Sequence, residues 1–171
     1  MNSKKRGNLY IGTSGFSYPH WGGGLFYPES LSPSEWLEYY SSYFNSIELN
    51  VTFNKLPHKD FFILWERQVP ENFKFSVKGN QYITHLKKLT AIAEPLKLFM
   101  ERIGKLKKKL ASVVWEIPPL KEQTLKKVEG FISHLKKYPK IRHIFNFEEI
   151  AQKKEVDQLL MKNGMFILSL S

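Results

Sequence analysis

Short apolar runs alternate along this chain with longer segments in which apolar residues recur every three or four positions. A short run bounded by glycine or polar residues predicts a buried strand, and the longer spacing predicts an amphipathic helix. The pattern therefore indicates a repeated strand–helix unit. Strands are expected at residues 9–11, 47–49, 73–78, 112–117, 143–147 and 165–170.

Amphipathic helices are expected between these strands. In the first, Ser32 can act as the cap, Pro33 suits the first helical position and Glu35 completes a capping box. The third is expected to span about 94–108. The positions expected to face inward are Trp36, Leu37, Tyr40, Tyr43 and Phe44 in the first helix, Phe61, Leu64 and Trp65 in the second, Leu96, Phe99, Met100, Ile103 and Leu106 in the third, Leu125, Val128, Phe131, Ile132 and Leu135 in the fourth, and Val156, Leu159 and Leu160 in the fifth.

This order of elements restricts the fold class. Repeated strand–helix units require parallel strands joined by right-handed crossovers, which predicts an α/β protein with a doubly wound sheet or a barrel. The glycine-rich turn at residues 12–15 lacks the G-x-G-x-x-G spacing, and about twenty irregular residues follow it where a dinucleotide-binding fold has a helix. A dinucleotide site is therefore not expected.

Several motifs occur in a fixed order along nearly the whole chain. They include G-T-S-G-F-S-Y-P-H-W at residues 12–21, F-N-S-I-E-L-N-V-T-F at 44–53, F-K-F-S-V-K at 73–78 and the strand that enters Pro118 and Pro119. Together they resemble the YecE-like proteins, known as domain of unknown function family 72. The resemblance implies a TIM-type (β/α) barrel with a pocket at the C-terminal ends of its strands, and it brings no established reaction.

The chain also departs from the family pattern. Asn54 replaces a tyrosine of the family motif, and Glu116 stands where a glutamine usually precedes the Pro-Pro turn. At the fifth strand the family's arginine–histidine pair is replaced by Glu148 and Glu149, so a role for that pair in anion or sugar binding does not carry over. Compared with the family, the chain ends before the last two strands, and a TIM barrel typically needs about 250 residues.

The expected architecture is therefore a single YecE-like domain over residues 1–171, an incomplete barrel of about six strand–helix units. In a complete barrel the first strand pairs with the eighth. Unpaired edges would then lie beside apolar residues such as Ile11, Phe166 and Leu168. We expect self-association, or a separate polypeptide that covers the open strand edges.

Composition limits the classes of function. The 171 residues are 42% hydrophobic and 25% charged, which suits one globular domain with a core. No run approaches the roughly 18 apolar residues of a membrane helix, and the basic start leads into an apolar run too short for a signal peptide. A soluble cytoplasmic protein without a membrane partner is expected. The absence of cysteine excludes disulfides, a thiolate nucleophile and cysteine-based metal sites.

The net charge of +10 raises the question of a nucleic-acid partner. The lysine pairs and clusters are mostly expected near helix ends or on outer helix faces, and only Lys109 directly abuts an apolar strand. A solvated lysine-rich surface is therefore favoured over nucleic-acid binding. A nucleic-acid-binding protein and a truncated inactive copy remain the alternatives to a small-molecule site.

Glu48 is the first candidate for acid/base chemistry. It lies between Ile47 and Leu49 at the end of an apolar strand, where an ionised carboxylate needs a partner. It could act on a substrate, or it could form a structural pair with Lys78 or a hydroxyl. Asn50 is expected to point to the same side of the strand.

Further candidates follow the later strands. Lys78 could hold an anion or pair with Glu48, His85 could titrate as a base or face solvent from a polar loop, and Glu116 could supply a second carboxylate. No His, Asp and Glu residues cluster at metal-ligand spacing, so no metal is expected. The cofactor is left undetermined.

The first loop adds aromatic and hydroxyl candidates. Tyr18, His20 and Trp21 could line a pocket or form the loop's own core. Ser14 lacks the flanking glycine pattern of a hydrolase nucleophile, and the sequence assigns it no base. The leading hypothesis is a pocket after the first four strands that binds a small polar or anionic molecule, with Glu48 as the acid/base and Lys78 or His85 orienting the ligand.

Overall fold

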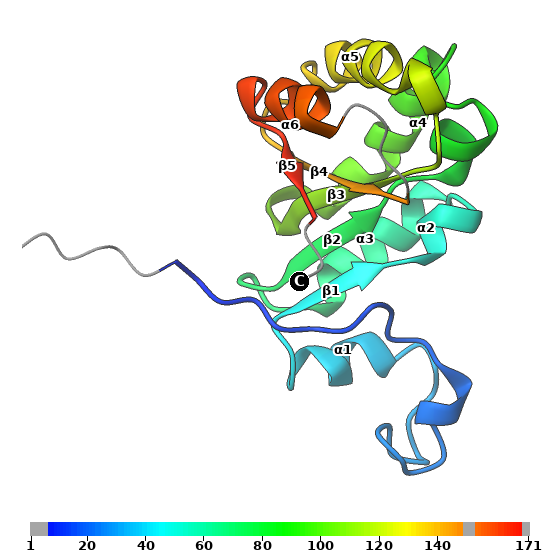
Figure 1. The fold of residues 1–171 in the computed structure, drawn as a ribbon. Coiled ribbons are helices and arrows are strands. Elements are labelled where there is room, and N and C mark those ends of the chain that lie inside the picture. Colours follow the sequence, from blue (N-terminus) through cyan, green and yellow to red (C-terminus); the bar gives the residue numbers. More distant parts are fainter. Residues whose placement is uncertain (1–6, 149–152, 169–171) are drawn as a thin grey trace, which may run out of the picture.

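The structure is a computed structural model that describes residues 7–148 and 153–168. Its centre is one sheet of parallel strands in which each strand lies beside the next one in the sequence, as Figure 1 shows. The strands are β1 (Ser46–Leu49), β2 (Lys74–Lys78), β3 (Leu110–Ile117), β4 (Arg142–Phe147) and β5 (Phe166–Ile167). The α/β class and the parallel strands are as expected.

Helices connect these strands. The α-helices are α1 (Trp36–Ser41), α2 (Val51–Asn54), α3 (Lys59–Gln68), α4 (Ala93–Ile103), α5 (Thr124–Leu135) and α6 (Lys153–Lys162). Shorter helical turns are η1 (Pro19–Trp21), η2 (Tyr82–Leu86), η3 (Gly104–Lys109) and η4 (Lys121–Gln123). None of the helices in the described part of the chain is long and apolar enough to cross a membrane.

The strand register divides the sheet into two faces. Leu49 pairs with Val77, which pairs with Val113, and all three are at most 2% exposed. Glu48 pairs with Ser76, which pairs with Ser112, so this row lies on the opposite face. Because right-handed crossovers between sequential strands place every connecting helix on one side, the apolar face is the covered face.

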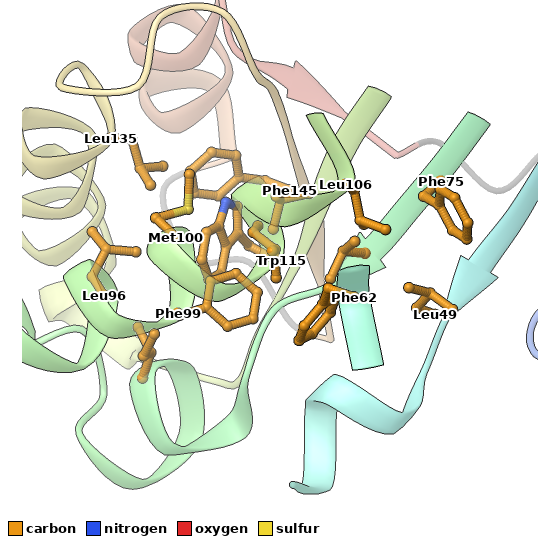
Figure 2. Packing of buried hydrophobic residues seen from close by; sticks show 14 of the residues in the cluster. Leu49, Phe62, Phe75, Leu96, Phe99, Met100, Leu106, Trp115, Leu135 and Phe145 are labelled. Carbon is orange, nitrogen blue, oxygen red and sulfur yellow. The ribbon is translucent and has the colours of Figure 1, made fainter. Parts of the chain in front are cut away.

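Aromatic side chains attach the helices to the apolar face. The rings of Phe99 on α4 and Trp115 on β3, both labelled in Figure 2, lie 5.5 Å apart. Phe131 on α5 lies 4.9 Å from Trp115 and 6.0 Å from Phe145 on β4. A Cβ atom at Gly79 would lie 2.2 Å from the indole of Trp115. A side chain at this position would therefore displace the central ring of the core.

The sheet is open in the described residues. Its strand order is the sequential order of a (β/α) barrel and differs from that of a doubly wound sheet. Residues 7–148 and 153–168 do not close it into a barrel, because β5 pairs only with β4. The TIM-type barrel thus stays an expectation from the family, while the parallel α/β sheet is confirmed.

The strand expected at residues 9–11 is wrong. The backbone of this segment bonds to the side chain of Asn45 and not to a neighbouring strand. The N–H of Ile11 donates to Asn45 Oδ1 at 2.7 Å, and Asn45 Nδ2 donates to Leu9 O at 2.9 Å. Strand-like pairing is limited to one bridge between Ser14 and Glu48. With no second neighbour to cover them, Leu9 and Ile11 stay 74% and 57% exposed.

Helix boundaries also differ from the expectation. The carboxylate of Glu35 accepts hydrogen bonds from Ser32 Oγ and Ser32 N, of which the second is one half of a capping box, and these bonds lower the pKa of Glu35. The α-helix nevertheless begins only at Trp36, because residues 33–35 form a separate turn. It ends at Ser41, so Tyr43 lies beyond it and is 63% exposed.

Two later elements are shorter than expected. The third helix stops at Ile103 and continues as η3, which is interrupted at Lys107, where φ is 53°. The last strand is limited to Phe166–Ile167, and residues 169–170 of the expected strand lie outside the described residues. Glu149 of the altered fifth-strand motif also lies outside them.

Lys109, the last residue of η3, stabilises the C-terminal end of α3. The residue is 4% exposed, and its ammonium donates to Glu66 O at 2.5 Å and to Val69 O at 2.8 Å. Carbonyls at a helix C-terminus lack partners within the helix, so a lysine can satisfy them. Lys107 contacts the same turn differently, because its exposed side chain forms an ion pair of 3.1 Å with the carboxylate of Glu66.

His143 is a buried titratable group at the start of β4. It is 2% exposed, and its Nδ1 accepts a hydrogen bond of 3.2 Å from Trp115 Nε1. Burial lowers its pKa from 6.5 to about 4, and the nearby Tyr138 carbonyl offsets part of this effect. Its Nε2 makes no hydrogen bond to the described residues. The folded chain therefore holds this ring in the neutral form.

Replacing Lys109 by methionine is expected to lower the free energy of unfolding by about 2–3 kcal/mol, because two buried carbonyls lose a charged donor. Lys107→Met is the matched control and should cost less than about 1 kcal/mol, since it removes only an exposed ion pair. Urea denaturation of both variants measures the difference. Equal losses in the two variants would contradict this role of Lys109.

Acid should destabilise the chain through His143. Its folded-state pKa lies below the unfolded value, so the unfolded state binds the extra proton, and stability is complete above pH 6.5 and lost as the pH falls towards about 4. The expected loss is about 3 kcal/mol. His143→Phe keeps an aromatic ring and removes the titration. In urea melts across this range its stability should fall less steeply with pH, and parallel curves for the two proteins would refute the assignment.

The open edges predict that the 171-residue chain self-associates. Beyond the single bridge at Ser14, no described residue pairs with the outer edge of β1, and Ile11, Phe166 and Leu168 are 57%, 50% and 40% exposed beside the two edges. Unpaired strand edges recruit other chains. Size-exclusion chromatography with light scattering should therefore report a dimer or a larger species. A cooperatively melting monomer would show that the edges are covered in another way.

Candidate functional site

Polar side chains gather where β1, β2 and β3 end. Glu48, Lys78 and Glu116 lie in or at the ends of these strands, on the face that the connecting helices leave free. The carboxyl ends of parallel strands meet at one edge of the sheet, which is where ligands bind in α/β proteins. The location of the candidate residues in the fold is thus the one expected.

The first loop runs directly against the end of β1. Glu48 N donates to Thr13 O at 3.0 Å, and Gly15 N donates to Glu48 O at 2.9 Å. The approach needs glycine at position 12, because a Cβ atom there would lie 1.9 Å from Ser46 O. Gly15 has a φ of 93°, which turns the chain away after the contact. The glycines of the motif therefore bring Ser14 to Glu48.

Ser14, Glu48 and Asn50 form a hydrogen-bonded chain. Asn50 Nδ2 donates to Ser14 Oγ at 2.7 Å, and Ser14 Oγ donates to Glu48 Oε1, also at 2.7 Å. The described residues form no hydrogen bond with the other carboxylate oxygen of Glu48, and its side chain is only half-buried. One oxygen of Glu48 is thus held in place while the other can meet a ligand.

Glu48 is the hydrogen-bond acceptor for Ser14, to which the sequence assigned no base. Ser14 and Glu48 are 34 positions apart, so no local spacing indicates that a carboxylate accepts the serine proton. The amide oxygen of Asn50 is enclosed, and no described residue donates to it. An unsatisfied buried acceptor costs about 1–3 kcal/mol and is often found at functional sites.

Lys78 pairs with Glu116 and not with Glu48. Its ammonium lies 2.5 Å from Glu116 Oε1, and the two side chains are 21% and 24% exposed. The same ammonium lies 4.8 Å from the centre of the Phe53 ring, where the negative face of the ring attracts it. Lys78 is therefore largely neutralised by contacts within the protein.

His85 lies in η2, and not in the polar loop that was expected. Its Nδ1 lies 2.8 Å from Thr84 Oγ1, its Nε2 lies 3.0 Å from Glu148 Oε1, and its ring meets Phe53 edge-on at 5.3 Å. Both nitrogens are therefore occupied. An N–H at Nε2 can donate to Glu148, and Nδ1 can accept from the Thr84 hydroxyl.

The aromatic residues of the first loop pack mainly on one another. Tyr18 lies 4.8 Å from Trp21 and 5.6 Å from His20, between ring centres. Trp21 packs on Phe26 and Tyr27, so it belongs to the loop's own core. The hydroxyl of Tyr18 donates to Ser14 O and connects this core to the Glu48 group.

The candidates thus form two groups. The first joins Ser14, Glu48, Asn50 and Tyr18, and the second joins Lys78, Glu116 and His85. The second group also contains Phe53, Thr84 and Glu148, which the sequence did not single out as site residues. Glu148 was noted only as a departure from the family, and its role depends on a contact across 63 positions. Within residues 7–148 and 153–168, no three His, Asp or Glu side chains are placed to hold a metal ion.

A sequential parallel sheet with polar groups at its carboxyl edge defines an α/β protein of the singly wound type. The chain belongs to the family described as Protein of unknown function DUF72, whose model matches residues 10–168. The resemblance read from the motifs is thereby confirmed.

Known relatives agree with this assignment. The protein is similar to the UPF0759 protein YecE of Escherichia coli strain K12, with 26% identity over 110 residues, which is 64% of this chain and 38% of YecE. A DUF72 family protein from Thermotoga maritima MSB8 superposes with a TM-score of 0.74 and 27% identity over 92% of this chain and 63% of its own. One from Enterococcus faecalis V583, at 18% identity, shares the fold with a TM-score of 0.64 over 77% of this chain and 52% of its own.

Proposed function

We propose that the chain binds a small polar molecule at the carboxyl ends of β1 to β4 and that Glu48 exchanges a proton with it. The observation that carries the proposal is the hydrogen-bonded chain from Asn50 through Ser14 to Glu48. A carboxylate with one fixed oxygen and one free oxygen has the geometry of a general base or acid. The proposal includes no cofactor and no metal.

Charge favours a neutral ligand over an anionic one. The site brings together three carboxylates, those of Glu48, Glu116 and Glu148, and one lysine. An anion would have to displace Glu116 from Lys78, and it would also be repelled by Glu48. A molecule with several hydroxyl groups can instead donate hydrogen bonds to the carboxylates without this cost.

The remaining residues act as positioning groups. Ser14 orients the Glu48 carboxylate, and the Lys78–Glu116 pair fixes the neighbouring wall of the site. His85 connects Thr84 to Glu148 and holds the β4 side in place. In this arrangement His85 is less suited to act as a free base than Glu48.

The nucleic-acid alternative gains no support from this site. Its carboxylates would repel a phosphate backbone, so a polyanion would have to bind elsewhere on the lysine-rich surface. That alternative stays a prediction from net charge alone.

Glu48→Gln is expected to abolish ligand binding with less than about 1 kcal/mol loss in stability, because the amide oxygen can still accept the Ser14 hydrogen bond. The probes are neutral polyols and monosaccharides, with sugar phosphates as the anionic set, and the readout is the rise in melting temperature on binding. At least one neutral probe should raise the melting temperature of the native chain and leave the melting temperature of Glu48→Gln unchanged.

Glu38→Gln is the matched control, because Glu38 is exposed on α1 and lies outside the site. It should respond to the probes like the native chain. Stabilisation by sugar phosphates alone would overturn the preference for neutral ligands. A stabilising neutral probe that acts equally on Glu48→Gln would overturn the role of Glu48, and no response to any probe would overturn the binding proposal.

A further inference from the structure

One apolar face of α3 is left largely uncovered by the described residues. The spacing of Phe61, Leu64 and Trp65 places them on one side of the helix, but the residue that enters the core is Phe62, which is fully buried. Phe61 and Leu64 are 53% and 48% exposed. A helix normally packs its apolar stripe against the rest of the domain. Here part of the stripe faces an open space.

That space is a cleft of about 530 Å³ on the helix-covered side of β1. Its walls come from the first loop, the segment around the start of α1, the junction of β1 and α2, and α3. The volume is within the range of small-molecule sites, which are about 300–1,000 Å³. The lining residues are Gly15, Phe16, Ser17, Tyr18, Pro33, Ser34, Leu37, Leu49, Asn50, Val51, Phe61, Leu64, Trp65 and Gln68.

Aromatic rings dominate the lining. Phe16 meets Trp65 edge-on with 6.5 Å between ring centres, and Phe61 lies 6.1 Å from Trp65. The ring of Tyr18 contributes from the same loop as Phe16. Aromatic walls favour planar aromatic ligands, because ring pairs gain energy beyond the area that they bury.

The described residues that line the cleft include no charged one, although a quarter of the whole chain is charged. The polar groups are hydroxyls and the amides of Asn50 and Gln68, and Gln68 Nε2 already donates to Ser34 O at 2.6 Å. An ion moved into such a cleft would lose its hydration without gaining a partner. The cleft therefore selects against charged ligands.

We propose that this cleft is a second binding site, which takes a neutral molecule with a planar aromatic ring. The cleft borders the Glu48 group, since Asn50 and Tyr18 belong to both, but it opens on the other face of β1, because Leu49 lines it while Glu48 points to the opposite face. A small molecule fits better than a partner helix. A volume of about 530 Å³ matches a drug-sized molecule, whereas a helix about 10 Å in diameter needs a longer groove.

The test uses para-fluorobenzyl alcohol as the neutral aromatic probe and fluorine NMR line broadening as the readout. The native chain should bind it with a dissociation constant on the order of 1 mM. The charged analogues para-fluorobenzoate and para-fluorobenzylamine should bind at least about ten-fold more weakly. Equal binding of either charged analogue, or no broadening with the alcohol, would overturn the proposal.

Leu64→Glu places a charge on the wall of the cleft and should weaken binding of para-fluorobenzyl alcohol about ten-fold. Leu25→Glu is the matched control, because Leu25 is 75% exposed and lies outside the cleft. Val51→Glu repeats the test from another wall, at a position that is 49% exposed, so that both variants keep the core. Unchanged binding in both cleft variants would overturn the site.

Glu48→Gln separates this proposal from the proposed function. It should bind para-fluorobenzyl alcohol like the native chain, whatever it does to polyol binding. If Glu48→Gln no longer bound the aromatic probe, the ring would have to bind at the carboxylate group, and the proposal of a second site would be overturned.

Discussion

The alternation of side chains along the parallel strands is the constraint on which the structure depends. At β1, Leu49 and Glu48 are neighbours in the sequence and point to opposite faces, and the register extends the two rows to Val77 and to Ser76. A slip of one residue would exchange the two rows and bury the carboxylate under the helices. The same register therefore maintains the core and exposes the polar site.

The polar site is arranged mainly by pairing within the protein. Glu116 neutralises Lys78, and Glu148 binds His85, so each of these four groups has a partner within its own pair. Glu48 differs from them because its hydrogen bond comes from a neutral hydroxyl, that of Ser14. Because Glu48 has no cationic partner among the described residues, it is the carboxylate on which the proposed function rests.

The edge of the sheet at the end of β4 is more acidic in this chain than in the family pattern, which has an arginine–histidine pair there. In this chain position 148 is a glutamate, and it holds His85 of η2. The strand end thus carries a negative group where the family pattern has a positive one. Any ligand of this chain meets a more acidic edge than the family pattern implies, so a preference for anions does not carry over from the resemblance.

The sequence by itself determined the elements and the class of fold. Short apolar runs and helical spacing predicted the five strands of the described sheet and most helices, but they also predicted a strand at residues 9–11 that does not form. The motifs placed Glu48 and Asn50 at a strand end. The family and the edge of the sheet that carries the candidate residues could therefore be predicted from the sequence.

Only the tertiary structure decided which groups meet. Lys78 pairs with Glu116 because the β2–β3 register sets Lys78 beside Val114, on the face that Glu116 also occupies. Periodicity defines a helical face but not the angle at which the helix packs, so Phe62 enters the core while Phe61 stays open to the cleft. Such choices depend on contacts between segments far apart in the chain, and local spacing carries no information about them.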